Sequence, residues 1–221
     1  MVCGGRTAEK YTVSVKGVDR KRWCGSSVVE QFADIEKVGD STSPRTTMIV
    51  ISDLHIGRKD CMIDELVAFI EDNPTDLLVL NGDIFDQFAR DGLWKEHWAK
   101  VKYLRKYLKM MHTGIIYLIG NHDYLMFLLI PFGKLLGIKI RKRVVIGEYL
   151  IEHGDWISYY LKLRGFKTGT YHENCELFAV IKGKKLLVGH SHYPHEGYRV
   201  IDVGDWVEHG TYFNSEDNTT A

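Results

Sequence analysis

Short apolar runs recur along the chain from residue 48 onward, and polar side chains follow most of them directly. Apolar residues at successive positions predict strands buried on both faces, because alternate side chains of a strand point to opposite sides. The runs of this form are 48–52, 77–80, 115–119, 149–151 and 185–188. An acid, an amide or a histidine stands within a few residues after each run. In an open α/β sheet, side chains at the carboxyl ends of strands gather at one edge and form the site.

Between the first runs, apolar residues recur at steps of three and four, which is typical of helices packed on a sheet. We expect helices over 62–72, ended by Pro74, and over 94–112, ended by Gly114. The later segments predict a helix over 124–136, strands over 138–140, 144–146, 198–203 and 206–212, a loop with one helical turn over 156–170, and a hairpin of 177–181 with 185–188. This order predicts mixed sheets with helices outside them.

Residues 1–47 lack a sustained strand or helix period. Parts of this segment, 23–31 and 39–47, resemble conceptual translations of transfer-RNA genes. We therefore expect an N-terminal extension, either a flexible arm or a stretch ahead of a natural start at Met48. The functional domain would span 48–213, and the polar residues 214–221 would form a frayed tail.

Composition fits one globular domain, with 221 residues, 45% hydrophobic and 26% charged. The formal net charge of zero gives no support for a nucleic-acid or membrane partner. No apolar run reaches the roughly 18–20 residues of a membrane span, and no N-terminal signal is visible. The four cysteines, Cys3, Cys24, Cys61 and Cys175, have no short spacing, so we expect reduced thiols and a cytoplasmic protein.

The residues that end the apolar runs are of the kinds that bind metal ions. In chain order they are Asp53-x-His55, Gly82-Asp83-x-x-Asp86, Gly120-Asn121-His122-Asp123, His153 and Gly189-His190-x-His192. One such fragment is weak evidence, because a salt-bridged Asp beside a surface His is common. Repetition at five strand ends favours a shared site. Imidazole and carboxylate ligands without thiolates suit Mn, Fe, Zn or Ni.

This ordered set resembles the calcineurin-like metallophosphoesterase superfamily from Met48 to about Tyr212. The resemblance implies an α/β fold, a four-layer α/β/β/α sandwich of two mixed sheets flanked by helices. It also implies a hydrolase with two divalent metal ions, Mn first, that cleaves a phosphate mono- or diester or a pyrophosphate by in-line attack of a bridging hydroxide. One metal would be held by Asp53, His55, Asp83 and His192, and the other by Asp83, Asn121, His153 and His190.

The same resemblance makes His122 the proton donor to the leaving oxygen, oriented by Asp86; the alternative is that His122 only positions Asn121. We expect Asp123 to cap the following helix. The segment 204–206 and the spacing from Gly120 to Asp155 resemble one branch, the UDP-2,3-diacylglucosamine pyrophosphohydrolases. That branch typically has Arg at the position of His122, which favours a more generic phosphoesterase.

Two other functions stay open: a non-catalytic binding scaffold of this fold, and a nuclease of the same superfamily. The expected substrate is a phosphorylated small molecule or a nucleotide, with nucleic acid less favoured. Segments 124–132 and 156–166 follow ligand motifs, so both are expected to border the cleft, with Tyr159, Arg164 and His195 as substrate-binding candidates. The apolar segment 124–132 is equally consistent with packing on the sheet or with a homodimer contact.

Overall fold

The computed structural model describes residues 47–90, 93–126, 128, 137–216 and 219–220. All of them belong to one compact unit. The N-terminal extension expected over residues 1–47 lies outside the described residues, except for Thr47.

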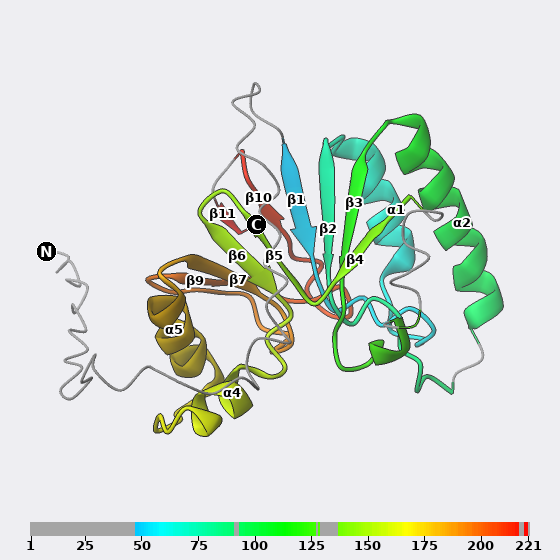
Figure 1. Ribbon diagram of the computed structural model, residues 1–221. Helices are drawn as coiled ribbons and strands as arrows, with labels where there is room; N and C mark the ends of the chain where they lie inside the picture. The colour runs from blue at the N-terminus through cyan, green and yellow to red at the C-terminus, as the bar shows by residue number, and fades with distance from the viewer. Residues whose placement is uncertain (1–46, 91–92, 127, 129–136, 217–218, 221) are drawn as a thin grey trace, which may run out of the picture. The chain divides into compact units, whose positions relative to one another are not determined.

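Two sheets carry the structure (Figure 1). The first has the strand order β11 (Thr219–Thr220), β10 (Phe213–Asn214), β1 (Met48–Ile51), β2 (Leu77–Asn81), β3 (Gly114–Leu118) and β4 (Lys139–Arg141). The second has the order β5 (Arg143–Ile146), β6 (Tyr149–Glu152), β7 (Lys185–Val188), β9 (Val200–Asp202) and β8 (His195–Glu196). The main helices are α1 (Ile63–Asp72), α2 (Trp94–Met110), α4 (Ile157–Leu163) and α5 (Tyr171–Lys182).

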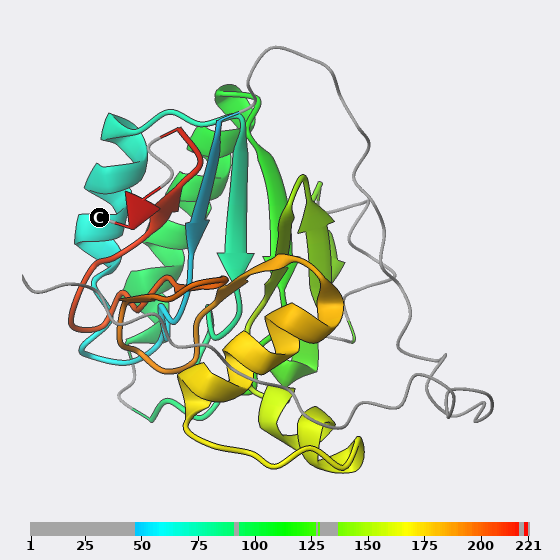
Figure 2. The same ribbon diagram turned by 90° about the vertical axis from the view of Figure 1, so that its left-hand side faces the viewer.

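Three apolar cores separate four layers, as the sequence predicted. Along β1, Ile49 and Ile51 pack toward α1 and α2, whereas Met48 and Val50 pack into the core between the two sheets. The second sheet divides in the same way: Leu187 of β7 faces the first sheet, and its neighbours face α4 and α5. Figures 1 and 2 show the helices on the outer side of each sheet. Burial on both faces explains why these strands contain unbroken apolar runs.

Parallel pairing brings the polar residues after the strands to one edge. β1, β2 and β3 are parallel, with Ile51 opposite Leu80 and Asn81 opposite Leu118. β6 and β7 are also parallel in the second sheet. Each of these strands therefore delivers its carboxyl end, and the residues that follow, on the same side as its parallel neighbour.

The helices predicted over 62–72 and 94–112 are confirmed as α1 and α2. The predicted hairpin of 177–181 with 185–188 is wrong, because 177–181 form the last turns of α5. Thr170 and Glu173 make a capping box at the start of this helix, and Gly183 ends it with a φ of 64°. These signals, a Thr-x-x-Glu box and a glycine in the left-handed region, define a helix of 12 residues.

Other local predictions also need correction. The expected loop over 156–170 contains α4, which buries Ile157 and Leu161 one turn apart. No strand forms over 206–212, where the side chain of Asp205 accepts the amides of three following residues and holds a turn. The tail expected to be frayed contains Asn214 of β10, which pairs with Thr219. Most of the helix expected over 124–136 lies outside the described residues, and 124–126 form one 3₁₀ turn.

Two further expectations concern location. Among the described residues, no helix is long and apolar enough to cross a membrane. Cys61 and Cys175, the two cysteines in the described part of the chain, are both free thiols.

The core under α5 gives a direct test of the corrected fold. Phe178 is fully buried between α5 and the second sheet, whereas Val180 on the same helix is 53% exposed. Phe178→Ala should lower the free energy of unfolding by about 3–5 kcal/mol, because it leaves a cavity in a packed core. Val180→Ala, the matched control, should change it by about 0.5 kcal/mol or less. Urea denaturation followed by circular dichroism measures both; equal losses would contradict the placement of this helix.

Candidate metal centre

Backbone hydrogen bonds join the polar loops that follow the strands. The amide of Asp53 donates to the carbonyl of Gly82 at 3.1 Å, and the amide of His55 donates to that of Asp83 at 2.9 Å. On the other side, the amide of His190 donates to Asp53 Oδ2 at 2.9 Å. The loop after β1 therefore lies between the loop after β2 and the loop after β7.

The backbone of these loops is unusual as well. Six described residues other than glycine have a positive φ, and five of them belong to the predicted ligand set. The five are Asp53, His55, Asp83, His190 and His192, with φ between 49° and 71°. Each costs roughly 1–3 kcal/mol in this region, so it persists only where the surrounding structure holds it. Strain concentrated at these positions supports a functional centre.

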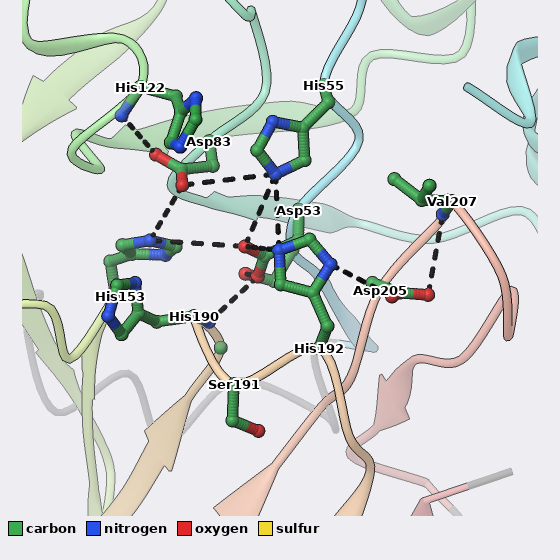
Figure 3. A network of polar contacts seen from close by, with 12 residues as sticks. Asp53, His55, Asp83, His122, His153, His190, Ser191, His192, Asp205 and Val207 are labelled. Carbon is green, nitrogen blue, oxygen red and sulfur yellow. Dashed lines mark hydrogen bonds and ion pairs between the residues drawn. The ribbon is translucent and has the colours of Figure 1, made fainter. Parts of the chain in front are cut away.

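One group of ligand atoms centres on Asp53. Its Oδ1 lies 3.4 Å from His192 Nε2, 3.8 Å from His55 Nε2 and 4.0 Å from His153 Nε2. Figure 3 shows these rings pointing toward the two carboxylates. Asp53, His55 and His192 can each offer an atom within 4.8 Å of the others, which is close enough to share one cation.

A second group adjoins the first through Asp83. Asp83 Oδ2 lies 3.2 Å from His153 Nε2 and 4.0 Å from His55 Nε2. Asp83, His153 and His190 form a further trio of ligand atoms within 4.8 Å of one another. Because Asp83 faces rings of both groups, it is placed as a bridging ligand would be.

Two buried atoms indicate that a cation fits here. Asp53 Oδ1 and His153 Nε2 are buried without a hydrogen-bond partner. Their contacts are ion pairs of 3.2–4.0 Å and not hydrogen bonds, and a metal ion would satisfy both atoms more fully. The donors are nitrogen and oxygen only, so the set suits a borderline or hard divalent cation.

The charges in this centre are strongly coupled. Burial alone would raise the pKa of Asp53, but the nearby His153 and His55 rings and hydrogen bonds from Ser52 and the His190 amide to Oδ2 hold it below its usual range. Burial alone would lower the pKa of His153, yet Asp53 and Asp83 raise it to about 10. Without a metal, His153 therefore carries a proton at neutral pH. A cation would displace that proton, since only the neutral imidazole ligates.

In three of the histidines, Nδ1 contacts an oxygen atom on the side of the ring that faces away from the centre. Nδ1 of His153 lies 2.9 Å from the carbonyl of Asn81, and Nδ1 of His55 lies 3.2 Å from Asp86 Oδ2. Nδ1 of His192 lies 3.0 Å from Asp205 Oδ2. Each oxygen accepts a hydrogen bond from Nδ1–H, so Nε2 faces the centre and carries no proton when the ring is neutral.

Asp205 is the residue that the sequence analysis missed, although 204–206 had been noted. It is buried, and its Oδ1 accepts the amides of Val207, Glu208 and His209. These bonds, with one from His192, hold the pKa of Asp205 below its usual range despite burial. The signal was present: Asp205 follows the apolar run of β9, as Asp53 follows that of β1.

His122 lies next to both groups. Its Nδ1 is 3.3 Å from Asp86 Oδ2, the same oxygen that contacts His55, and its ring meets the His55 ring edge-on at 4.7 Å. The amide of His122 donates to Asp83 Oδ1 at 2.7 Å. Asp86 therefore contacts both His122 and His55, and the orienting role expected of it stays a prediction.

Asp123 does not act through its side chain as a helix cap. The side chain is buried and accepts the amides of Gly120 and Ile84 at 2.7 and 3.0 Å, and the Tyr117 hydroxyl. It thereby ties the loop after β3 to the loop after β2. Gly120 has to be glycine, because a Cβ there would collide with Asp83 Oδ1.

The other residues predicted for the site lie outside the groups of ligand atoms among the described residues. Asn121 is exposed beside His122, so its role as a ligand stays a prediction. Tyr159 is exposed on α4, and Arg164 stacks over the ring of Tyr160; neither belongs to the ligand groups. His195 stacks on His172 at 4.2 Å, near the loop that carries His190 and His192.

Comparison with known proteins bears on this geometry. A model of the calcineurin-like phosphoesterase family matches residues 46–219. The chain belongs to this family. No curated protein sequence matches it. The family is metal-dependent, in agreement with the groups of ligand atoms described above.

Among solved structures of low sequence identity, a protein-tyrosine phosphatase with a TM-score above 0.5 shows the same fold; two further structures have lower TM-scores. A cold-active protein-tyrosine phosphatase of a psychrophile, Shewanella sp., has a TM-score of 0.51 and 15% identity, covering 80% of this chain and 77% of that one. YfcE, a phosphoesterase from E. coli, has a TM-score of 0.45 and 15% identity, covering 76% and 87%. The Pseudomonas putida nuclease MPE has a TM-score of 0.40 and 16% identity, and the match covers 78% of this chain and 85% of that one. The narrower pyrophosphohydrolase branch is not tested by these likenesses.

Asp205 offers a test of how the centre is held. In Asp205→Asn, three backbone amides keep the side-chain oxygen toward them, so the NH₂ group faces His192 Nδ1. His192 would then carry its proton on Nε2, where the cation should bind. We expect metal affinity to fall about 10–100-fold.

Chelator competition measures the affinity, and ¹⁵N NMR of His192 reports its tautomer. The control is Glu208→Gln, which makes the same change of charge on an exposed side chain of the same turn. Unchanged affinity and an unchanged tautomer in Asp205→Asn would contradict this role.

Proposed function

We propose that this protein is a metal-dependent phosphoesterase with two divalent cations in the adjoining ligand groups. The observation that carries the proposal is the meeting of three imidazole Nε2 atoms on Asp53 Oδ1, a buried oxygen without a hydrogen-bond partner. The first cation would be held by Asp53, His55, Asp83 and His192. The second would be held by Asp83, His153, His190 and the exposed Asn121.

Two bound cations, of which Mn²⁺ is our first expectation, would activate water and neutralise phosphoryl oxygens. The residues around the centre would hold the metal-binding side chains in place for this chemistry. The outer partners of His55, His153 and His192 fix their Nε2 atoms toward the centre before any ligand arrives. Fixed ligands lower the reorganisation needed on binding, and the two buried carboxylates would be compensated by the cations.

His122 is the proposed proton donor to the leaving oxygen. It is partly exposed beside the ligand groups, and Asp86 lies 3.3 Å from its Nδ1. When the ring is protonated on both nitrogens, its Nδ1–H faces the Asp86 carboxylate, so the proton that can pass to the leaving oxygen is the one on Nε2. The phosphoryl group would therefore lie between the cations and His122, with its leaving group on the His122 side.

A binding scaffold is the alternative from another class. A scaffold has no need to keep strained ligand residues, and five positive φ angles support an active centre instead. A nuclease is the alternative within enzymes; it differs in substrate and not in the centre, so an assay has to separate them.

The function is tested with protein loaded with Mn²⁺ on nitrophenyl phosphate, bis-nitrophenyl phosphate, a UDP-sugar and plasmid DNA. We expect hydrolysis of one of these small esters, lost with chelator and restored by metal. Asp83→Asn should lose both turnover and bound metal, because one carboxylate faces both groups. Glu65→Gln, on an exposed side chain of α1, is the control. Metal content near two per chain in Asp83→Asn, by elemental analysis, would count against bridging.

The role of His122 predicts a dependence on the leaving group. His122→Ala should lower kcat by about 10²–10⁴ for an ester of a poor leaving group, such as an alkyl phosphate. The loss should be much smaller for nitrophenyl phosphate, because nitrophenolate leaves without a proton. Metal content should stay unchanged, which separates proton donation from ligation. The same loss on both esters would mean that His122 acts in another way.

A further inference from the structure

A line of aromatic rings leads from the ligand groups to the surface. The ring of His192 stacks on that of His55 at 5.1 Å, and the ring of His122 meets His55 at 4.7 Å. The ring of Phe88 in turn lies edge-on to the ring of His122, with 5.8 Å between the ring centroids. Tyr124 follows, 6.4 Å from Phe88 and tilted by 37°.

Phe88 is held in place but not covered by the described residues. Its amide donates to Asp86 Oδ1 at 2.9 Å, so its backbone is anchored to the carboxylate that contacts His122. The preceding amide, of Gln87, donates to the carbonyl of His122 at 3.2 Å. The Phe88 side chain is nevertheless 59% exposed, and those of Tyr124 and Leu125 are 49% and 52% exposed.

Single exposed apolar side chains are ordinary on a protein surface. These three residues differ because they form a group. Phe88 contacts His122, the proposed proton donor, Tyr124 contacts Phe88, and Leu125 follows Tyr124 in the chain. An apolar surface with a few polar groups beside it is the usual form of a small-molecule site. The ring of His122 lies between the cation ligand His55 and Phe88, so a substrate group that leaves past His122 reaches Phe88 next.

We propose that Phe88 and Tyr124 bind the leaving group of the substrate, and that the substrates are phosphate esters whose leaving group carries a flat aromatic ring. This inference rests on the proposed function, because it takes His122 as the group beside the leaving oxygen. Edge-to-face and stacked contacts with Phe88 and Tyr124 would favour a ring over an alkyl chain. The surface on α4 suggested by the sequence, with Tyr159 and Arg164, is not needed for this selectivity.

Binding of phosphonates tests the proposal without turnover. Naphthylmethylphosphonate and methylphosphonate share the phosphoryl group and differ in the ring. We expect the Mn²⁺-loaded protein to bind the first more tightly, and Phe88→Ala to weaken it about tenfold while methylphosphonate changes less than about twofold. Phe88→Leu should fall between, because it keeps apolar bulk without a flat ring. Tyr198→Ala, which removes an aromatic side chain 84% exposed on the other sheet, is the control.

The outcomes separate this inference from the proposed function. Equal weakening of both phosphonates in Phe88→Ala would make Phe88 a support for His122 and overturn the proposal, as would no weakening of either. Sedimentation gives a further outcome. If Phe88→Ala has a lower mass than the unmodified protein and the same phosphonate affinities, the aromatic surface is a contact between two copies of the chain, and the proposal is overturned. Selective ring binding without hydrolysis of any ester would sustain the aromatic site and refute the phosphoesterase.

Discussion

Two carboxylates buried at the strand ends are the constraint on which this site depends. Asp53 and Asp83 are almost fully buried, and a buried charge is tolerated only when it is paired or bound to a metal. Imidazoles from the loops after β1, β6 and β7 surround them. In the metal-free chain, protonated His153 supplies part of the compensation, since its pKa is raised to about 10. Two cations would supply it more fully, which makes ion binding the natural completion of this arrangement.

The fold brings these side chains together by repeating one local arrangement, a buried strand followed by a turn. A strand buried on both faces ends at the same edge as its parallel neighbours, and the next residues turn into the left-handed region. Such turns point side chains inward that would otherwise continue along the sheet. Hydrogen bonds between the loops, and outer partners such as Asn81, Asp86 and Asp205, then hold the rings. Because each loop depends on its neighbour, the ligands are fixed as one unit.

The sequence predicted the four layers and the gathering of polar residues at the strand ends because both follow from local patterns. An unbroken apolar run such as 48–51 can satisfy two cores only as a central strand, and the residue after it has to lie at the sheet edge. Local pattern was ambiguous for 177–181, where a run of five apolar residues suits a strand or a buried helix equally. The position of Asp205 after the apolar run of β9 was visible in the sequence, but its contact with His192 was not, and neither was the contact of Phe88 with His122, because both depend on how loops from different strands pack together. The role of Tyr159 in substrate binding stays a prediction; burial of Ile157 and Leu161 on α4 directs this residue between them toward solvent.

Asp86 connects the two halves of the proposed chemistry. One oxygen, Oδ2, lies 3.2 Å from Nδ1 of His55 and 3.3 Å from Nδ1 of His122. His55, a proposed ligand of the first cation, and His122, the proposed proton donor, therefore both contact one carboxylate oxygen. The second oxygen, Oδ1, accepts the amide of Phe88, so the aromatic surface is tied to the same side chain. In the proposed mechanism, Asp86 would therefore position a cation ligand, the proton donor and the leaving-group surface together. A fixed separation among these three is what in-line phosphoryl transfer requires, since attack and departure occur on opposite sides of the phosphorus.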